Sequence, residues 1–262
     1  MKAIWNGAIG FGLVNIPVKM YSAVESSNLE LHMLDKKDLA HIRYKRVNED
    51  TGAEVKYENI VKGYNLDGKY IVLDEEDYAA ASPEKSKIFS IDEFVMEDEI
   101  DSVYFEVPYF LEPQKNAESA YYLLLKALKE SKRAGVGTFV MRDKEVLGMI
   151  RPYQDDILIV NRLRFAQEIR DYKQLKLPPK KEPKAGELKM AISLIEQTSE
   201  TFNPAAFHDT YAEDLMKIIK RKAKGTHIKK VENEPKENGK VVDLMAQLKA
   251  SLEHSKKNKK VS

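Results

Sequence analysis

The sequence groups positively charged side chains around aromatic residues. The stretch LDKKDLAHIRYKR at residues 34–46 carries five cations around Tyr44. Lys and Arg side chains of this kind contact nucleic-acid phosphates, which gives affinity without reading base sequence. For any single residue an ordinary surface cation is the simpler interpretation, but the collective pattern favours a polyanionic ligand. The candidate contacts are Lys36, Lys37, Arg43, Lys45, Arg46, Lys132, Arg133, Arg142, Arg162 and Arg164.

The sequence lacks the motifs of the common enzyme classes. It contains no GxxxxGK[ST] or GxGxxG loop, no GxSxG elbow and no HExxH helix. It has no cysteine, so disulfides and thiolate metal sites are impossible. His32 and His41 can approach each other across a hairpin, but no carboxylate at matching spacing completes a metal site. We therefore expect a protein that is not an enzyme and that holds no metal or other cofactor.

Two other functions remain open from the residues alone. The acidic run MEDEID at 96–101, with Asp155 and Asp156, has the carboxylates that a Mg²⁺-dependent nuclease needs, although such runs are usually solvated surface. Tyr44 and Tyr57 are candidates for the aromatic platforms on which a single-strand-binding barrel stacks bases. Degradation of linear duplex in Mg²⁺ would indicate the nuclease, and competition between duplex and single-strand probes would indicate the single-strand binder.

Charge is balanced overall but segregated along the chain. The 262 residues include 43 Lys and Arg against 42 Asp and Glu, a formal net charge of +1. Residues 217–262 hold 14 basic and 5 acidic residues, a net of +9, which leaves −8 for the rest. Such segregation is typical of a protein that keeps one surface for a polyanion and repels it from another. A solubilising surface with a basic tail explains the same numbers, so charge alone does not distinguish it from a polyanion-binding surface.

The apolar opening AIWNGAIGFGLVNIPVKMYSA at residues 3–23 does not fit a signal peptide. Asn6 and several glycines interrupt it, and Pro17 and Lys19 stand where a cleavage site is needed. No run of about 18 apolar residues predicts a membrane span. We expect a soluble cytoplasmic protein, associated with the nucleoid and not with a membrane.

Elements that position these residues can be predicted from periodicity and composition. Residues 137–164 predict three strands with short polar turns, an antiparallel meander. In a strand over 42–47, Arg43 and Lys45 point one way while Tyr44 and Arg46 point the other. Many short strands in one unit favour a barrel or a sandwich. The other predicted strands are 8–18, 29–34, 42–47, 70–73, 87–91 and 102–110.

Helices are predicted within and after the strand-rich region. Residues 117–133 have helical spacing, with Asn116 as the cap and Gly135 as the stop. A Pro- and Lys-rich connector at 175–184 precedes a helix at 186–201. Asn203 and Pro204 then begin another helix, which Gly225 terminates.

The last predicted helix needs a partner. A helix of about 13 residues is marginal alone in water, so it must bury its apolar face against the protein's own body or in a partner's groove. Its narrow aliphatic face, without Trp or Phe, makes a membrane surface the least favoured partner. The face consists of Val241, Leu244, Met245, Leu248 and Leu252.

Five blocks of the sequence resemble, in order, the bacterial Ku proteins, the homodimeric DNA-end-binding factors of non-homologous end joining. The resemblance implies that the apolar opening forms the first strands of the core. It implies a mixed β fold with α-helices, in which an antiparallel β-barrel and a helical C-terminal arm dimerise into a ring around duplex DNA. The blocks are AIWNGAIGFGLVNIPVKMYSA, IRYKR, GVGTFVMRDKEVLGMIRP, LIEQTSETFNPAAFHDTYAEDLMKIIKRKAKG and VVDLMAQLKASLE.

The resemblance also implies partners and a domain plan. The ten candidate cations line the channel that holds double-stranded DNA ends, and Val241–Leu252 contacts the bacterial end-joining ligase, of the ligase D type. Dimer contacts are expected from the helices between Ala117 and Gly225 and from the region Val103–Phe110. The domains are a barrel core at 1–184, a helical arm at 185–225, a flexible linker at 226–240 and, at 241–262, the ligase-contacting segment with a short basic tail.

The chain departs from the family pattern in two places. Some relatives carry two cysteines just after the IRYKR block, where this chain has Asn48 and Thr51, so a metal site at that point is excluded. The lysine-rich extension that is long in some relatives is reduced here to Lys256–Lys260. We therefore do not carry over to this chain the role of a long tail in holding DNA.

Overall fold

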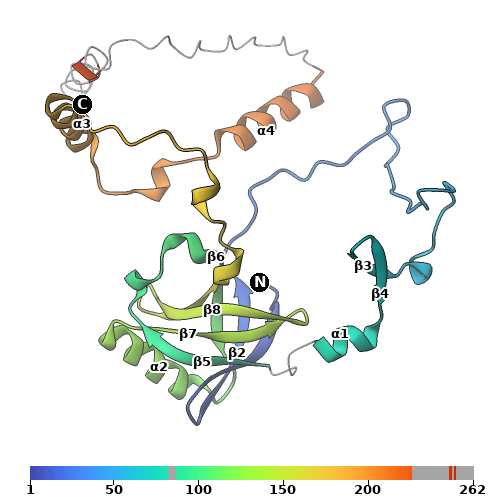
Figure 1. The fold of residues 1–262 in the computed structure, drawn as a ribbon, viewed down its shortest axis with the longest axis horizontal. Helices are drawn as coiled ribbons and strands as arrows, with labels where there is room; N and C mark the ends of the chain where they lie inside the picture. The colour runs from blue at the N-terminus through green and yellow to red at the C-terminus, as the bar shows by residue number, and fades with distance from the viewer. Residues whose placement is uncertain (82–86, 226–247, 250, 252–262) are drawn as a thin grey trace. The chain divides into compact units, whose positions relative to one another are not determined.

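The computed structural model of the chain describes residues 1–81, 87–225, 248–249 and 251 (Figure 1). The chain divides into two compact units. The first consists of Met1–Ser26 with Glu30–Tyr172, and the second consists of Ser27–Leu29 with the chain from Lys173 onward.

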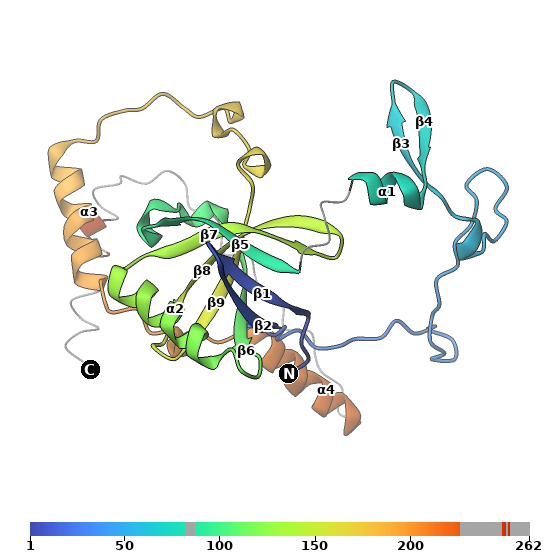
Figure 2. The ribbon, with the colours of Figure 1, turned by 90° about the horizontal axis from the view of Figure 1, so that it is seen from below.

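Within the described residues, seven strands close a barrel in the order β1-β2-β6-β9-β8-β7-β5 (Figures 1 and 2). All neighbours are antiparallel except β1 and β5, whose parallel pairing of Ala8 with Ile88 closes the barrel. The predicted meander of β7, β8 and β9 and the predicted barrel are confirmed. The strands are β1 (Trp5–Phe11), β2 (Val14–Ser22), β5 (Ile88–Val95), β6 (Phe105–Pro113), β7 (Ala134–Met141), β8 (Lys144–Tyr153) and β9 (Ile157–Leu163).

The glycine-rich opening forms a hairpin, where the sequence predicted a single strand over 8–18. Gly12, at φ 56°, makes the turn between β1 and β2. A Cβ on Gly7 would lie 2.2 Å from the carbonyl oxygen of Lys87. Glycine therefore permits the close backbone approach at the parallel seam.

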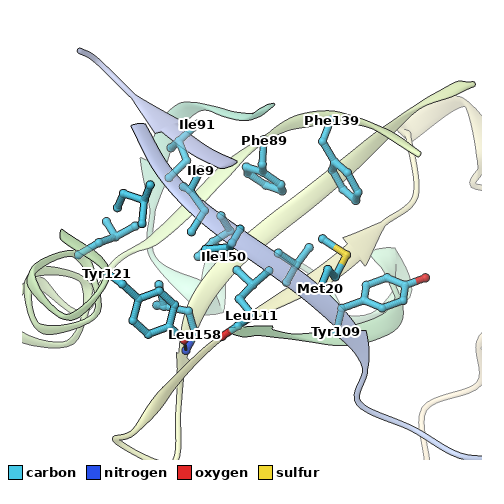
Figure 3. Close-up of a cluster of buried hydrophobic side chains, with 14 of the residues drawn as sticks. Ile9, Met20, Phe89, Ile91, Tyr109, Leu111, Tyr121, Phe139, Ile150 and Leu158 are labelled. Atoms are coloured by element: carbon cyan, nitrogen blue, oxygen red, sulfur yellow. Dashed lines mark hydrogen bonds between the residues drawn. The ribbon is translucent and has the colours of Figure 1, made fainter. Parts of the chain in front are cut away.

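Large apolar side chains fill the barrel and one helix completes this core. Ile9, Met20 and Leu111 are fully buried, and Figure 3 shows them facing Phe89 and Ile150 across the interior. The helix α2 (Glu118–Ser131) adds its own buried face to the same cluster. That face consists of Tyr121, Leu124, Leu125 and Leu128.

A smaller apolar cluster lies on the other face of β8. Side chains alternate along a strand, so Val146 and Ile150 join the barrel core while Met149 joins the second cluster. Tyr104 and Ile100 pack against this second cluster. They come from the segment between β5 and β6, which contains short 3-10 turns at Glu97–Glu99 and Ser102–Tyr104.

The predicted strands at 29–34 and 42–47 are wrong. Leu34 and His41 form one isolated bridge, and Val47 and Glu54 form another. Side-chain hydrogen bonds favour tight local turns over strand pairing here. The carboxamide oxygen of Asn48, for example, accepts from the backbone N–H groups of Asp50 and Thr51.

A separate hairpin follows this segment. Strands β3 (Lys62–Leu66) and β4 (Lys69–Leu73) pair with each other, and α1 (Glu75–Ala81) comes next. The turn uses Asp67 and Gly68 at positive φ, and the Asn65 side chain accepts from the backbone N–H of Gly68. The predicted strand at 70–73 is confirmed as β4.

Several predicted helix boundaries need correction. The N-cap of α2 is Ala117, without a side-chain hydrogen bond, where the sequence predicted Asn116, and α3 (Ala185–Thr198) ends at Thr198 and not at residue 201. The helix α2 ends at Ser131 because Lys132 adopts the left-handed conformation at φ 54°, and Gly135 lies inside β7, where its small size fits the packed sheet. Asn203 caps only the short 3-10 turn Pro204–Ala206. The helix α4 (Thr210–Ala223) has its own cap, the Asp209 carboxylate, which accepts from the Ala212 N–H.

The second unit contains α3 (Ala185–Thr198) and α4. Gly225, at φ 77°, follows α4 as predicted. Between the helices, the rings of Phe202 and Phe207 stack at 5.8 Å and both are exposed. The predicted linker at 226–240 and, except for Leu248, the whole apolar face of the predicted last helix lie outside the described residues.

Candidate nucleic-acid interface

The first group of candidate cations lies in the irregular segment before β3. Lys36, Lys37 and Arg43 are exposed there. Lys45 forms an ion pair of 2.6 Å with Glu54, with both side chains more than half exposed. The guanidinium of Arg46 lies 5.2 Å from the centroid of the Tyr57 ring, a cation–π contact. Since the segment is not a strand, the predicted alternation of these side chains between two faces does not apply.

The second group lies where α2 ends and β7 begins. Lys132 and Arg133 are exposed beside a cleft of about 360 Å³, which Glu97 and Arg151 also line. Cations are favoured at this end of a helix because the last carbonyl groups carry partial negative charge. The partial charge at the helix end is therefore a structural reason for cations at this position, apart from any ligand.

Arg151 in the same cleft was not among the predicted contacts. Its side chain is only 24% exposed, and its Nε lies 3.3 Å from Glu97 and donates to the side-chain oxygen of Asn161 at 3.0 Å. Asn161 is itself buried. Only pairing between β8 and β9 reveals this contact, so no local pattern could have identified it.

The third group lies at the end of β9. The Nε of Arg162 is 2.7 Å from one carboxylate oxygen of Glu106, and Nη2 of Arg164 is 3.7 Å from the other. The predicted sharing of one strand face by the two arginines is therefore observed. Glu106, which was not predicted, neutralises part of their charge.

Arg142 stands apart from the other barrel candidates. It lies in the turn between β7 and β8 at φ 52°, while Arg133 precedes the first residue of β7. The eight residues of β7 span about 26 Å at the usual rise of a strand. The candidate cations of a single barrel therefore do not all lie together.

The acidic residues considered for a nuclease have local structural roles. Glu99 accepts from the backbone N–H of Met96, and Asp155 pairs with Lys129 at 2.6 Å. In the part of the chain that the structure describes, no three His, Asp or Glu side chains come close enough to hold a metal ion. The rings of His32 and His41 do approach each other, at 5.4 Å between centroids, as predicted.

Tyr44 and Tyr57, the candidate stacking platforms, are 82% and 77% exposed. One face of Tyr57 already carries Arg46. Of the proposed ligase contacts, Leu248 alone is described, and it is helical. None of the helices in the described residues is long and apolar enough to cross a bilayer.

Comparison with known proteins matches nearly the whole chain. The family model described as Ku, the Ku70/Ku80 beta-barrel domain, matches residues 10–190. The non-homologous end joining protein Ku of Coxiella burnetii is 39% identical over 269 residues, covering 99% of this chain and 97% of that protein. The protein of the same name from Mycobacterium tuberculosis is 37% identical over 269 residues, covering 100% of this chain and 98% of that protein.

Proposed function

The chain belongs to the Ku family of non-homologous end joining proteins, and from this premise we propose that two copies form a ring that threads onto the ends of double-stranded DNA. The observation that carries the proposal is the match over nearly the full length to proteins named for end joining. In this role the protein is not an enzyme, because a closed ring selects ends by topology: it can load only where the duplex stops.

Affinity in such a ring comes from cations that face phosphates. Lys132, Arg133 and Arg142 form no ion pair with any described residue, so their charge is available. Lys36, Lys37 and Arg43 are exposed and supply further positive charge. Phosphate contacts give no preference for base sequence, which suits a protein that must hold any broken end.

Dimerisation is supported by apolar surface that a single chain leaves exposed. Tyr64, Tyr70 and Ile71 on the hairpin of β3 and β4 are all at least 40% exposed. An isolated two-stranded hairpin is marginal in water, and Phe202 and Phe207 in the second unit expose further aromatic surface. A second copy of the chain would bury these side chains.

The C-terminal region is proposed to recruit the end-joining ligase of the ligase D type. The domain plan is a barrel core at 1–184, an arm at 185–225, a linker at 226–240 and a ligase-contacting segment with a basic tail at 241–262. The amphipathic pattern of Val241–Leu252 supports this role, because a helix that short gains stability on a partner. Such a protein works at the nucleoid, in the cytoplasm.

A competition experiment tests the proposal. Linear, hairpin-blocked and covalently closed circular duplexes of equal length compete for the protein in a gel-shift assay, with single-stranded DNA as a further competitor. We expect capture of the linear duplex alone, and affinity that falls steeply with salt, by about 0.9 in the log–log slope for each phosphate neutralised. Equal capture of the closed circle, preference for the single strand, or a flat salt dependence would contradict it.

A further inference from the structure

A β-bulge brings Glu106 to the two arginines at the end of β9. The pairing of β6 with β9 contains one extra residue on β6 between Phe105 and Pro108. The bulge leaves both Glu106 and Val107 opposite Arg162, and Val107 packs against the barrel core. Bulges redirect a side chain in this way and often occur next to functional sites.

The guanidinium of Arg164 binds groups of the same chain. Nη1 donates to the carbonyl oxygens of Phe105 at 2.7 Å and of Val103 at 3.1 Å, and Nη2 faces Glu106 at 3.7 Å. The backbone N–H of Arg164 adds a bond of 2.8 Å to the carbonyl of Tyr104. These contacts hold the start of β6 against the end of β9 and occupy both N–H groups of Nη1, so the terminal fork of Arg164 is not open to a ligand.

Arg162 is arranged differently. Among its contacts with described residues, the one polar partner of its side chain is Glu106, through Nε at 2.7 Å. The two terminal nitrogens have no polar partner among the described residues. They form the fork that binds a carboxylate or phosphate in bidentate fashion. The side chain of Arg162 is 40% exposed.

We infer that Glu106 positions Arg162 so that its open fork binds a DNA phosphate, that Glu106 also limits the strength of this contact, and that Arg164 is structural. This division of roles rests on the proposed function. A carboxylate held by Nε fixes the direction of the fork, and its negative charge repels the incoming phosphate. Net charge for the three side chains is +1, so the site attracts a phosphate but holds it weakly enough for a ring to move along the duplex.

The test uses the full chain as a dimer and measures affinity for a linear duplex by fluorescence anisotropy over a series of KCl concentrations. Arg162→Gln is expected to lower the magnitude of the salt slope by about 0.9 for each protomer. Arg162→Lys keeps the charge and so keeps the slope, but it binds more weakly because it lacks the fork. Glu106→Gln is expected to tighten binding by about threefold for each protomer, from Coulomb's law for a charge about 6 Å away in water.

Two further variants separate positioning from structure and from net charge. Arg164→Gln is expected to lower the melting temperature and leave the salt slope unchanged. Asp214→Asn, which removes the carboxylate of an exposed 2.8 Å pair with Lys217, makes the same charge change as Glu106→Gln and is expected to leave affinity unchanged.

The outcomes are distinguishable. Wild-type salt slope and affinity in folded Arg162→Gln and Glu106→Gln would overturn the inference while leaving the proposed function intact. Equal tightening by Asp214→Asn would also overturn it, since net charge would then be the cause. A wild-type protein without salt-dependent binding to linear duplex would overturn the proposed function, and this inference with it.

Discussion

Replacing Tyr121 with Phe is expected to destabilise the barrel strongly without removing any carbon from the core. The Tyr121 hydroxyl donates to the carbonyl oxygen of Leu111 on β6 and accepts from the backbone N–H of Leu158 on β9, both at 2.7 Å. Figure 3 shows the ring between these strands and α2. One hydroxyl therefore joins a helix to two strands.

The size of the effect follows from the two groups that the substitution leaves unpaired. Tyr121 is 1% exposed and Leu158 and Leu111 are fully buried, so water does not easily replace the hydroxyl. Each buried donor or acceptor without a partner costs about 1–3 kcal/mol. We expect the free energy of unfolding to fall by about 3 kcal/mol in total, which corresponds to a melting temperature lower by about 10 °C for a domain of this size.

Urea unfolding followed by circular dichroism measures this loss. Tyr122→Phe is the matched control, because Tyr122 is the next residue and 55% exposed, and surface changes usually stay within about 0.5 kcal/mol. A Tyr121→Phe protein whose stability falls by less than about 1 kcal/mol would refute the reasoning, because the two backbone groups would then have found other partners.

Three other results are expected. Gly137→Ala should destabilise the barrel by about 3 kcal/mol, because the added Cβ would lie 1.7 Å from the carbonyl oxygen of Ser90. Gly186→Ala, where no atom lies within 4 Å of the new Cβ, should be neutral or stabilising in the same thermal melt. Equal effects of the two substitutions on the melting temperature would contradict the packing argument. Burial raises the pKa of Tyr121 to about 12 from 10.0, so the native state holds this proton more tightly than the unfolded state. The resulting stability is fully present below pH 10 and is lost as pH rises toward 12. If a Tyr121→Phe protein loses the same stability at alkaline pH in urea titrations, the loss belongs to other groups. Leu244→Asp combined with Leu248→Asp should abolish ligase stimulation in an end-joining assay and leave DNA binding intact, whereas loss of both would place this segment in the core.

Local patterns predicted the elements whose partners are close in sequence. The meander of β7, β8 and β9 follows from alternating residues and short turns, and α2 follows from its helical spacing. Gly225 was correctly placed after α4 because a left-handed residue commonly ends a helix. The closure of the barrel by parallel pairing of β1 with β5 joins segments about 80 residues apart and has no local signal.

The sequence was less informative about the candidate site. Alternation of apolar and polar residues at 29–34 and 42–47 suggested strands, but side chains such as Asn48 stabilise local turns in this segment instead. The cations could be identified by type, and the shared face of Arg162 and Arg164 followed from period two. Their neutralisation by Glu106 depends on a bulge, which inserts one residue without a distinctive sequence signature.

Trapping on DNA tests most directly whether the protein encircles the duplex. The protein is loaded on a linear duplex, the ends are joined by a ligase to make a closed circle, and the complex is challenged with high salt and competitor DNA. Encirclement predicts that the protein stays on the closed circle and leaves when a restriction enzyme cuts it. Equal release from the closed circle and from an uncircularised duplex would contradict the ring.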